Sequence, residues 1–217
     1  MRTKNNITNE KVIAFIDELY KPLTPELGAL RKSAEERIVP IITKDSETLL
    51  EALVRIQKTE SVLEIGTAIG YSAIFFASLS SDIKVTTLEF SEKMAAEAIN
   101  NIANWNFSER ISVLEGDALE TLKGIEGKFD LIFIDAAKGH YKEFFELCLK
   151  NVSPRSIIVS DNILYKGITA SEDFLTGRRN KTIMRRMRDY LSYITNLDFV
   201  TTSVLPVGDG VAISYVK

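Results

Sequence analysis

The spacing of apolar residues along the chain changes near residue 60. Before that point they recur every three or four positions, as in Phe15, Ile16 and Leu19, which is the spacing of one face of a helix. From Ser61 onward, apolar runs of strand length alternate with longer amphipathic stretches. This alternation is typical of parallel strands joined by helices that pack on the faces of the sheet. We therefore predict helices over residues 6–57 and an α/β region after them.

The α/β region divides into strands, helices and a β-rich tail. Strands are expected at 61–65, 83–89, 110–115, 129–134 and 155–160, and helices near 71–80, 92–104, 118–123, 140–150 and 179–194. The tail has two β-rich runs, 198–205 and 210–216, joined by the turn sequence Pro206–Gly210, which predicts an antiparallel hairpin. The predicted fold is a doubly wound, Rossmann-like α/β fold with a mostly parallel sheet.

Length and composition favour one ordinary globular domain. The 217 residues fit a single domain (1–217), with a helical extension (1–57) before an α/β core (58–217). The single cysteine, Cys148, and the single histidine, His140, exclude an internal disulfide framework and a Cys/His zinc cluster. No apolar run approaches the roughly 20 residues of a membrane span, so we expect a cytoplasmic protein without membrane association.

Charge is distributed unevenly along the chain. The net charge is −3, yet residues 176–190 contain six Arg and Lys residues against one Asp. Four of these basic residues recur at helical spacing: Arg178, Lys181, Arg185 and Arg188. A concentrated basic stripe of this kind attracts phosphate backbones, although a solvated helix face is the simpler alternative. Lys166, which lies between the last predicted strand and this helix, is expected to add a contact.

Polar residues at the ends of the first three strands predict a cofactor pocket. Gly66 and Gly70 follow the first strand and its Glu64, Glu89 ends the second strand, and Asp117 follows the third. In open α/β sheets, ligands bind at this carboxyl edge. The Gly-x-x-x-Gly spacing differs from the Gly-x-Gly-x-x-Gly of dinucleotide folds, which disfavours a nicotinamide cofactor. A carboxylate-lined nucleoside pocket without a phosphate loop suits S-adenosylmethionine.

The next two strands end in residues that favour a hard cation. Asp135 follows one strand, Asp161 and Asn162 follow the other, and Lys138 comes three residues after Asp135. Magnesium commonly uses one or two carboxylates together with waters and substrate. We therefore predict that Asp135, Asp161 and Asn162 bind Mg²⁺ or Mn²⁺ and that Lys138 is a catalytic base.

Several of these segments resemble the cation-dependent O-methyltransferases, the family that includes catechol and caffeoyl-CoA O-methyltransferases. The resemblance covers roughly residues 35–217 and is carried by Leu63–Gly66, Phe133–Lys138 and Asp161–Asn162. It implies the S-adenosylmethionine-dependent methyltransferase fold and the same metal ligands and base. It further implies that the methionine part of the cofactor contacts Ile42, Glu64, Gly66, Thr67 and Ser72, that Glu89 binds the ribose, and that Asp117 and Ala118 border the adenine, with Asp135 close to the cofactor as well.

Within that family, several segments resemble the bacterial tRNA 5-hydroxyuridine methyltransferases. The similar segments are Leu63–Ile74, Phe133–Gly139, Asp161–Gly167 and Pro206–Ser214. Together with the basic stripe, this resemblance favours methylation of 5-hydroxyuridine at the wobble position of a tRNA anticodon loop, and the family implies a homodimer. Two alternatives stay open: methylation of small catechol-like or hydroxycinnamoyl-type phenols, and a non-catalytic nucleotide- or RNA-binding module.

Overall fold

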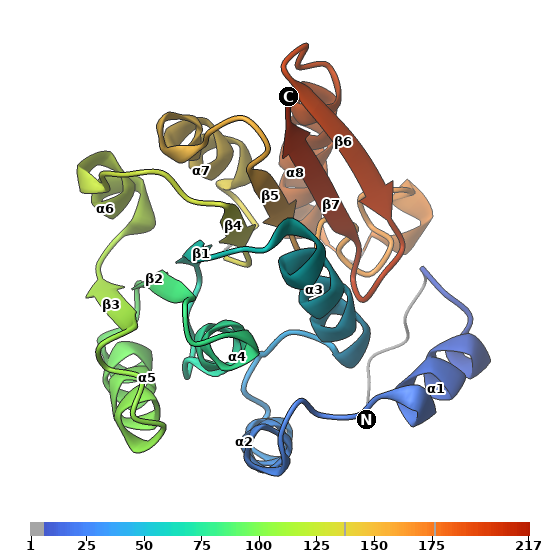
Figure 1. Cartoon of the computed structure of the whole chain (residues 1–217). Coiled ribbons are helices and arrows are strands. Elements are labelled where there is room, and N and C mark those ends of the chain that lie inside the picture. Colours follow the sequence, from blue (N-terminus) through green and yellow to red (C-terminus); the bar gives the residue numbers. More distant parts are fainter. Residues whose placement is uncertain (1–6, 137, 176) are drawn as a thin grey trace.

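A seven-stranded, mostly parallel sheet organises the molecule, in the order β3-β2-β1-β4-β5-β7-β6 (Figure 1). The computed structural model describes residues 7–136, 138–175 and 177–217. Its first five strands are parallel, and β7 runs antiparallel to both β5 and β6. The strands are β1 (Ser61–Ile65), β2 (Lys84–Glu89), β3 (Ile111–Glu115), β4 (Leu131–Ile134), β5 (Ile157–Ser160), β6 (Val200–Leu205) and β7 (Val211–Val216). The predicted fold class and C-terminal hairpin are confirmed, with strand ends shifted by up to two residues.

Helices cover both faces of the sheet, so successive side chains of a strand enter different cores. Val62 of β1 packs with α2 (Pro25–Glu36), α3 (Lys44–Gln57), α4 (Tyr71–Leu79) and α5 (Glu92–Asn104). The neighbouring Leu63 packs on the opposite face with α6 (Ala118–Gly124), α7 (Tyr141–Cys148) and α8 (Arg178–Thr195). The central strands β4 and β5 are buried at every position, because a parallel strand covered on both faces needs a continuous apolar run. This is the doubly wound arrangement that the alternating pattern predicts.

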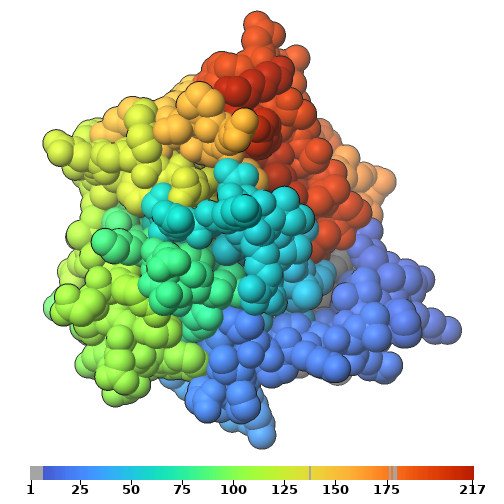
Figure 2. Space-filling model, in the orientation of Figure 1, coloured from blue at the N-terminus to red at the C-terminus, as the bar shows by residue number. Residues whose placement is uncertain are grey.

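The N-terminal part consists of helices that begin at polar capping residues. Asn9, Thr24 and Thr43 each accept a backbone N–H of the first turn, at the starts of α1 (Glu10–Leu19), α2 and α3. Figure 2 shows the segment of α1 and α2, in blue, along one side of the molecule. Helix α1 buries none of its residues and leaves Phe15 and Leu19 60% and 63% exposed. No helix in the described ranges is long and apolar enough to cross a membrane.

The β6–β7 turn, Pro206–Gly210, lies between the N-terminal part and the loop that follows β5. On one side, the Gly208 amide donates to Asp45 Oδ2 at the start of α3 (2.8 Å). On the other, the amides of Ile163 and Leu164 donate to the carbonyl oxygens of Gly210 and Asp209. Segments from both ends of the sequence therefore meet beside the carboxyl edge of the sheet.

Candidate active site

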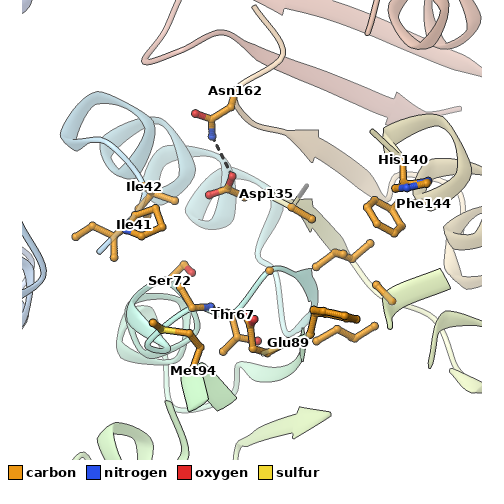
Figure 3. Close-up of a pocket in the computed structure, with 18 of the residues that line it drawn as sticks. Ile41, Ile42, Thr67, Ser72, Glu89, Met94, Asp135, His140, Phe144 and Asn162 are labelled. Atoms are coloured by element: carbon orange, nitrogen blue, oxygen red, sulfur yellow. Dashed lines mark hydrogen bonds between the residues drawn. The ribbon is translucent and has the colours of Figure 1, made fainter. Parts of the chain in front are cut away.

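A cavity of about 650 Å³ opens at the carboxyl edge of β1, β2 and β4, within the size range typical of small-molecule sites. Figure 3 shows Ile41, Ile42 and Ser72 on one side of it and His140 and Phe144 on the other. Ten predicted site residues line it: Ile42, Gly66, Thr67, Ser72, Glu89, Asp117, Ala118, Asp135, Lys138 and Asn162. The structure thus brings together side chains that are up to 120 residues apart in the sequence.

The floor of the cavity depends on Gly66. This residue has φ +107°, and its amide donates to the Leu88 carbonyl oxygen at 2.9 Å. A Cβ atom there would lie 2.0 Å from the carbonyl oxygen of Asp135. Only glycine combines this backbone conformation with so close an approach between the segments that follow β1 and β4. Gly66 therefore brings the cofactor loop and Asp135 into one site.

Glu64, predicted to contact the cofactor, does not line the cavity. It lies fully buried in β1 and has an unsatisfied oxygen. Its Oε2 accepts the Thr87 hydroxyl at 2.5 Å, whereas Oε1 has no hydrogen-bond partner. Burial raises the pKa of Glu64 to about 7, and the nearby carboxylates of Asp135 and Glu89 add to the effect while hydroxyl donors oppose it. An orphaned, buried carboxylate oxygen at this depth fits a cationic group of a ligand, such as the ammonium of S-adenosylmethionine.

Glu89 is held at the end of β2 by two backbone donors. Its oxygens accept the amides of Ala68 (2.8 Å) and Ser91 (2.9 Å), and Figure 3 shows the side chain within the cavity. A carboxylate oxygen has further lone pairs, so this arrangement leaves capacity to accept the hydroxyls of a ribose. The geometry fits the predicted role of Glu89.

The end of the cavity assigned to adenine is more apolar than the sequence analysis anticipated. Asp117 caps α6 by accepting the Leu119 amide at 2.9 Å, so its side chain is already engaged in the fold. The lining residues that were not predicted include Phe90, Met94, His140 and Phe144. Phe90 is 78% exposed directly after Glu89, and this exposed aromatic residue at a strand end was the available signal. Flat apolar surfaces of this kind suit a purine ring.

Asp135 and Asn162 meet at the opposite end of the cavity. The side-chain nitrogen of Asn162, Nδ2, donates to Asp135 Oδ1 at 2.9 Å, the dashed contact in Figure 3. Asp161 does not line the cavity: it is only 2% exposed, and its Oδ1 accepts the backbone N–H of Asn162 at 2.7 Å. The three predicted metal ligands are therefore adjacent, with Asp161 set deeper than the strand-end pattern indicates.

The electrostatics of these carboxylates fit a cation. Burial raises the pKa of Asp135, and burial together with the charge of Asp135 raises the pKa of Asp161 well above its ordinary value. Asp209, in the predicted β6–β7 turn, adds a third nearby carboxylate whose charge also raises the pKa of Asp161. Within the described ranges, no group of three or more His, Cys, Asp or Glu side chains has the geometry of a metal site. Two carboxylates, one amide and open positions fit Mg²⁺, which keeps several waters.

Lys138 lies at the rim between the carboxylates and Tyr165. Its ammonium is 5.3 Å from the centre of the Tyr165 ring, and its charge lowers the pKa of Asp135 against the larger effect of burial. Because the side chain lines the cavity and its charge acts on both Asp135 and Asp161, it faces the acidic end where a substrate would bind. This position is compatible with the predicted role as a base.

The loop after β5 has an unusual backbone that its surroundings hold in place. Asn162, Tyr165 and Lys166 all have positive φ values of 60°, 44° and 56°. Such conformations are costly for non-glycine residues and persist where contacts enforce them. The Lys166 amide donates to Asp209 Oδ1, and a Cβ at Gly210 would lie 2.3 Å from Leu164 Cγ. The β6–β7 turn therefore fixes the loop that presents Asn162.

The predicted RNA-binding stripe on α8 is only partly available to a ligand. Lys181 and Arg185 are exposed and border a shallow hollow together with Glu172 and Asp189. Arg188 also borders this hollow, but its guanidinium is engaged in the fold: it donates to the carbonyl oxygens of Thr169 (2.8 Å) and Ala170 (3.2 Å). The side chain of Arg178 lies outside the described part of the chain. The opposite face of α8, with Met184, Met187, Tyr190 and Ile194, is buried.

Comparison with known proteins gives a consistent result. Residues 22–216 match the family model described as O-methyltransferase. A catechol O-methyltransferase of Niastella koreensis is 30% identical over 98% of this chain and 100% of its own length. Caffeoyl-CoA O-methyltransferase 2 of Zea mays is 26% identical, covering 98% and 88%. The solved structure of an O-methyltransferase from Bacillus cereus in complex with SAH is 30% identical, covers 95% of this chain and 97% of that one, and has a TM-score of 0.81.

Proposed function

Because the chain belongs to the O-methyltransferase family and is an S-adenosylmethionine-dependent transferase, we propose that it methylates one of two adjacent hydroxyls of a catechol-like substrate with the help of a divalent cation. The relatives named above act, by their names, on catechol and caffeoyl-CoA, which supports the small-phenol alternative over the tRNA substrate that the sequence analysis favoured.

The observation that carries this proposal is the acidic end of the cavity. Asp135 and Asn162 are in contact there, Asp161 lies directly beneath them, and Lys138 lines the same end. A substrate with two neighbouring oxygens matches a site that holds a cation through only three protein groups. Glu64 and Glu89 lie under and beside the rest of the cavity, where the methyl donor would bind.

The roles of the residues follow from their positions. When bound, S-adenosylmethionine supplies an electrophilic methyl group, and the cation supplies positive charge that acidifies and orients a hydroxyl. Lys138 lines the cavity beside the acidic groups and takes the hydroxyl proton there. Asp135 and Asn162 fix the substrate end relative to the donor end, so that the two reactants are held together in one orientation. The apolar side chains of Phe90, Met94 and Phe144 keep water from the adenine end.

The proposal is tested by transfer of a labelled methyl group from S-adenosylmethionine to catechol, with phenol as the substrate that lacks the second hydroxyl. We expect transfer to catechol alone, its loss in EDTA, and its recovery with Mg²⁺ or Mn²⁺. Asp161→Ala should abolish transfer, whereas Asp82→Ala, at an exposed turn away from the cavity, should not. Equal transfer to phenol, or activity that survives EDTA, would contradict the proposal.

A second candidate substrate is tRNA carrying 5-hydroxyuridine at the wobble position, whose 5-hydroxyl and 4-carbonyl are also adjacent oxygens. The observation that favours it is the exposed pair Lys181 and Arg185 on α8. Methyl transfer to such tRNA should then fall when both residues are replaced by glutamine, while transfer to catechol stays unchanged. Unchanged methyl transfer to tRNA in the double variant would mean that Lys181 and Arg185 do not bind this substrate.

A further inference from the structure

Four polar side chains from the N-terminal half meet in the protein interior behind the cavity. They come from consecutive elements: Tyr20 after α1, Arg31 on α2, Glu47 on α3 and Tyr71 at the start of α4. Arg31 and Glu47 are only 4% and 2% exposed. We name this group the Arg31 cluster. All four positions lie in segments that the sequence predicts as helices, and no local pattern indicates a role for them.

The cluster is extensively hydrogen-bonded. Glu47 Oε1 accepts the Tyr20 hydroxyl (2.7 Å), and Oε2 accepts both the Tyr71 hydroxyl (2.6 Å) and Arg31 Nη2. Arg31 Nε lies 3.2 Å from each tyrosine oxygen, and the guanidinium carbon is 5.3 and 4.7 Å from the two ring centres. Burying an ion pair brings little net stability compared with apolar packing of the same volume, so its geometry is the more informative property.

One arm of the guanidinium reaches the wall of the cavity. Arg31 Nη1 donates to the Ile42 carbonyl oxygen at 3.0 Å. Residues 39–43 form neither helix nor strand, so this bond is a main anchor of the segment that places Ile41 and Ile42 on the cavity. Figure 3 shows both isoleucines on the same side as Ser72. Ser72 directly follows Tyr71, whose hydroxyl belongs to the cluster.

We propose that Arg31 is a positioning residue for the methyl donor: through Ile42 and Tyr71 it fixes the spacing between two walls of the cofactor cavity. This inference rests on the assignment of that cavity to S-adenosylmethionine made under the proposed function. Arginine suits the position because its planar fork contacts a carboxylate, two hydroxyls and a carbonyl oxygen at once, which the single ammonium of lysine cannot do.

The test compares Arg31→Lys with Arg110→Lys. Arg110 is a matched control because its Nη1 also donates to backbone carbonyl oxygens, those of Ala77, Ser80 and Ile83, but at the far end of α4. Affinity for S-adenosylhomocysteine is measured by calorimetry, and KM for S-adenosylmethionine and kcat are measured on catechol. We expect Arg31→Lys to raise the dissociation constant and KM about tenfold with kcat changed less than about twofold, while Arg110→Lys changes neither.

Equal losses of affinity in both variants, or none in Arg31→Lys, would overturn the proposal. If Arg31→Lys does not fold, Tyr20→Phe removes one hydroxyl of the cluster and retains both charges. Hydrogen exchange at residues 39–43 should then accelerate and S-adenosylhomocysteine should bind more weakly; unchanged exchange and affinity would overturn the proposal. Glu89→Gln tests the cavity assignment separately, because unchanged binding in that variant would refute the cofactor site whatever Arg31 does.

Discussion

At the scale of single residues, the cavity is surrounded by buried acidic groups whose charge the ligand-free protein does not fully compensate. Glu64 is a fully buried acid whose Oε1 has no partner. Burial raises the pKa of Asp135 and of Asp161, and the charge of Asp135 raises the pKa of Asp161 further. Such groups lower the stability of the ligand-free protein when they ionise. Perturbed acids of this kind cluster at functional sites because catalysis and binding require them.

Glu64 gives the ligand-free protein a specific pH dependence. Its pKa rises from 4.5 to about 7 on folding, so its contribution to stability is complete below pH 4.5 and is lost as the pH rises through 7. Glu64→Gln removes this loss. We therefore expect the unfolding free energy of the variant, relative to that of wild type, to increase by up to about 3 kcal/mol when the pH is raised from 4 to 8. Urea unfolding at both pH values measures the change.

The exposed Glu126→Gln is the control for this experiment and should show no such gain. Parallel pH profiles for wild type and Glu64→Gln would show that Glu64 is not protonated in the folded protein near neutral pH. The same substitution should weaken binding of S-adenosylhomocysteine, because the orphaned oxygen is lost as a negatively charged partner.

At the scale of elements, contacts between distant loops hold the groups proposed to bind the cation and substrate. The turn Pro206–Gly210 contacts the start of α3 through Gly208 and the loop after β5 through Asp209 and Gly210. That loop contains three left-handed, non-glycine residues, so its shape depends on these partners. Helix α8 has a similar role, since Arg186 donates to the Gly139 carbonyl oxygen and Arg188 holds the 169–170 segment.

Gly210→Ala tests the contact between the turn and the loop. Gly210 has φ +91°, and the added methyl would lie 2.3 Å from Leu164 Cγ and 2.8 Å from the Leu164 amide. We expect a loss of about 2–4 kcal/mol in stability from strain and overpacking, together with weaker Mn²⁺ binding through displacement of Asn162. Denaturant unfolding and electron paramagnetic resonance of Mn²⁺ measure the two effects.

Gly127→Ala separates the clash from the backbone strain. Gly127 has a similar φ of +86°, but a methyl there would meet nothing within 4 Å. It should cost about 1 kcal/mol and leave Mn²⁺ binding intact. Equal effects of the two substitutions would mean that the Leu164 contact does not hold the loop.

Arg188→Gln tests the support that α8 gives to the loop. Loss of the bonds to Thr169 and Ala170 should expose the 167–175 region, and we expect about 1–2 kcal/mol lower stability and faster proteolysis there. Lys181→Gln, on the same face of α8, should change neither property. If the Arg188→Gln variant is cleaved no faster than wild type, Arg188 does not support the loop and is an ordinary member of the basic surface stripe.

At the scale of the whole molecule, the regular part of the architecture could be predicted from sequence and the long-range polar contacts could not. Short apolar runs that stop near Glu64, Asp135 and Asp161 mark the ends of strands. These ends can be predicted because the spacing of apolar residues and the turn residues that follow are properties of neighbouring positions in the sequence. The partners of Arg31 and Arg188 depend on which helices pack together, and polar residues on amphipathic helices resemble ordinary surface positions. The depth of Asp161 below the cavity likewise follows from tertiary packing.

Mg²⁺ should stabilise the whole chain if the acidic end binds it. Ionised Asp135 and Asp161 repel each other when no cation is present, so at pH 8 we expect Mg²⁺ to raise the melting temperature and EDTA to lower it. Asp161→Asn should abolish the response, and the exposed Asp82→Asn should preserve it. A shift of equal size in Asp161→Asn would place the bound ion elsewhere.

The position of β7 in the sheet also determines when the site can form during synthesis. This strand, Val211–Val216, is inserted between β5 and β6, and it follows directly on the turn that holds the Asn162 loop. A growing chain has already made the cofactor loop and the acidic residues by then, but it lacks the segment that fixes them. The nascent protein therefore exposes the edge of β5 and leaves the Asn162 loop unsupported until β7 emerges, and this is the interval in which a chaperone would protect it most.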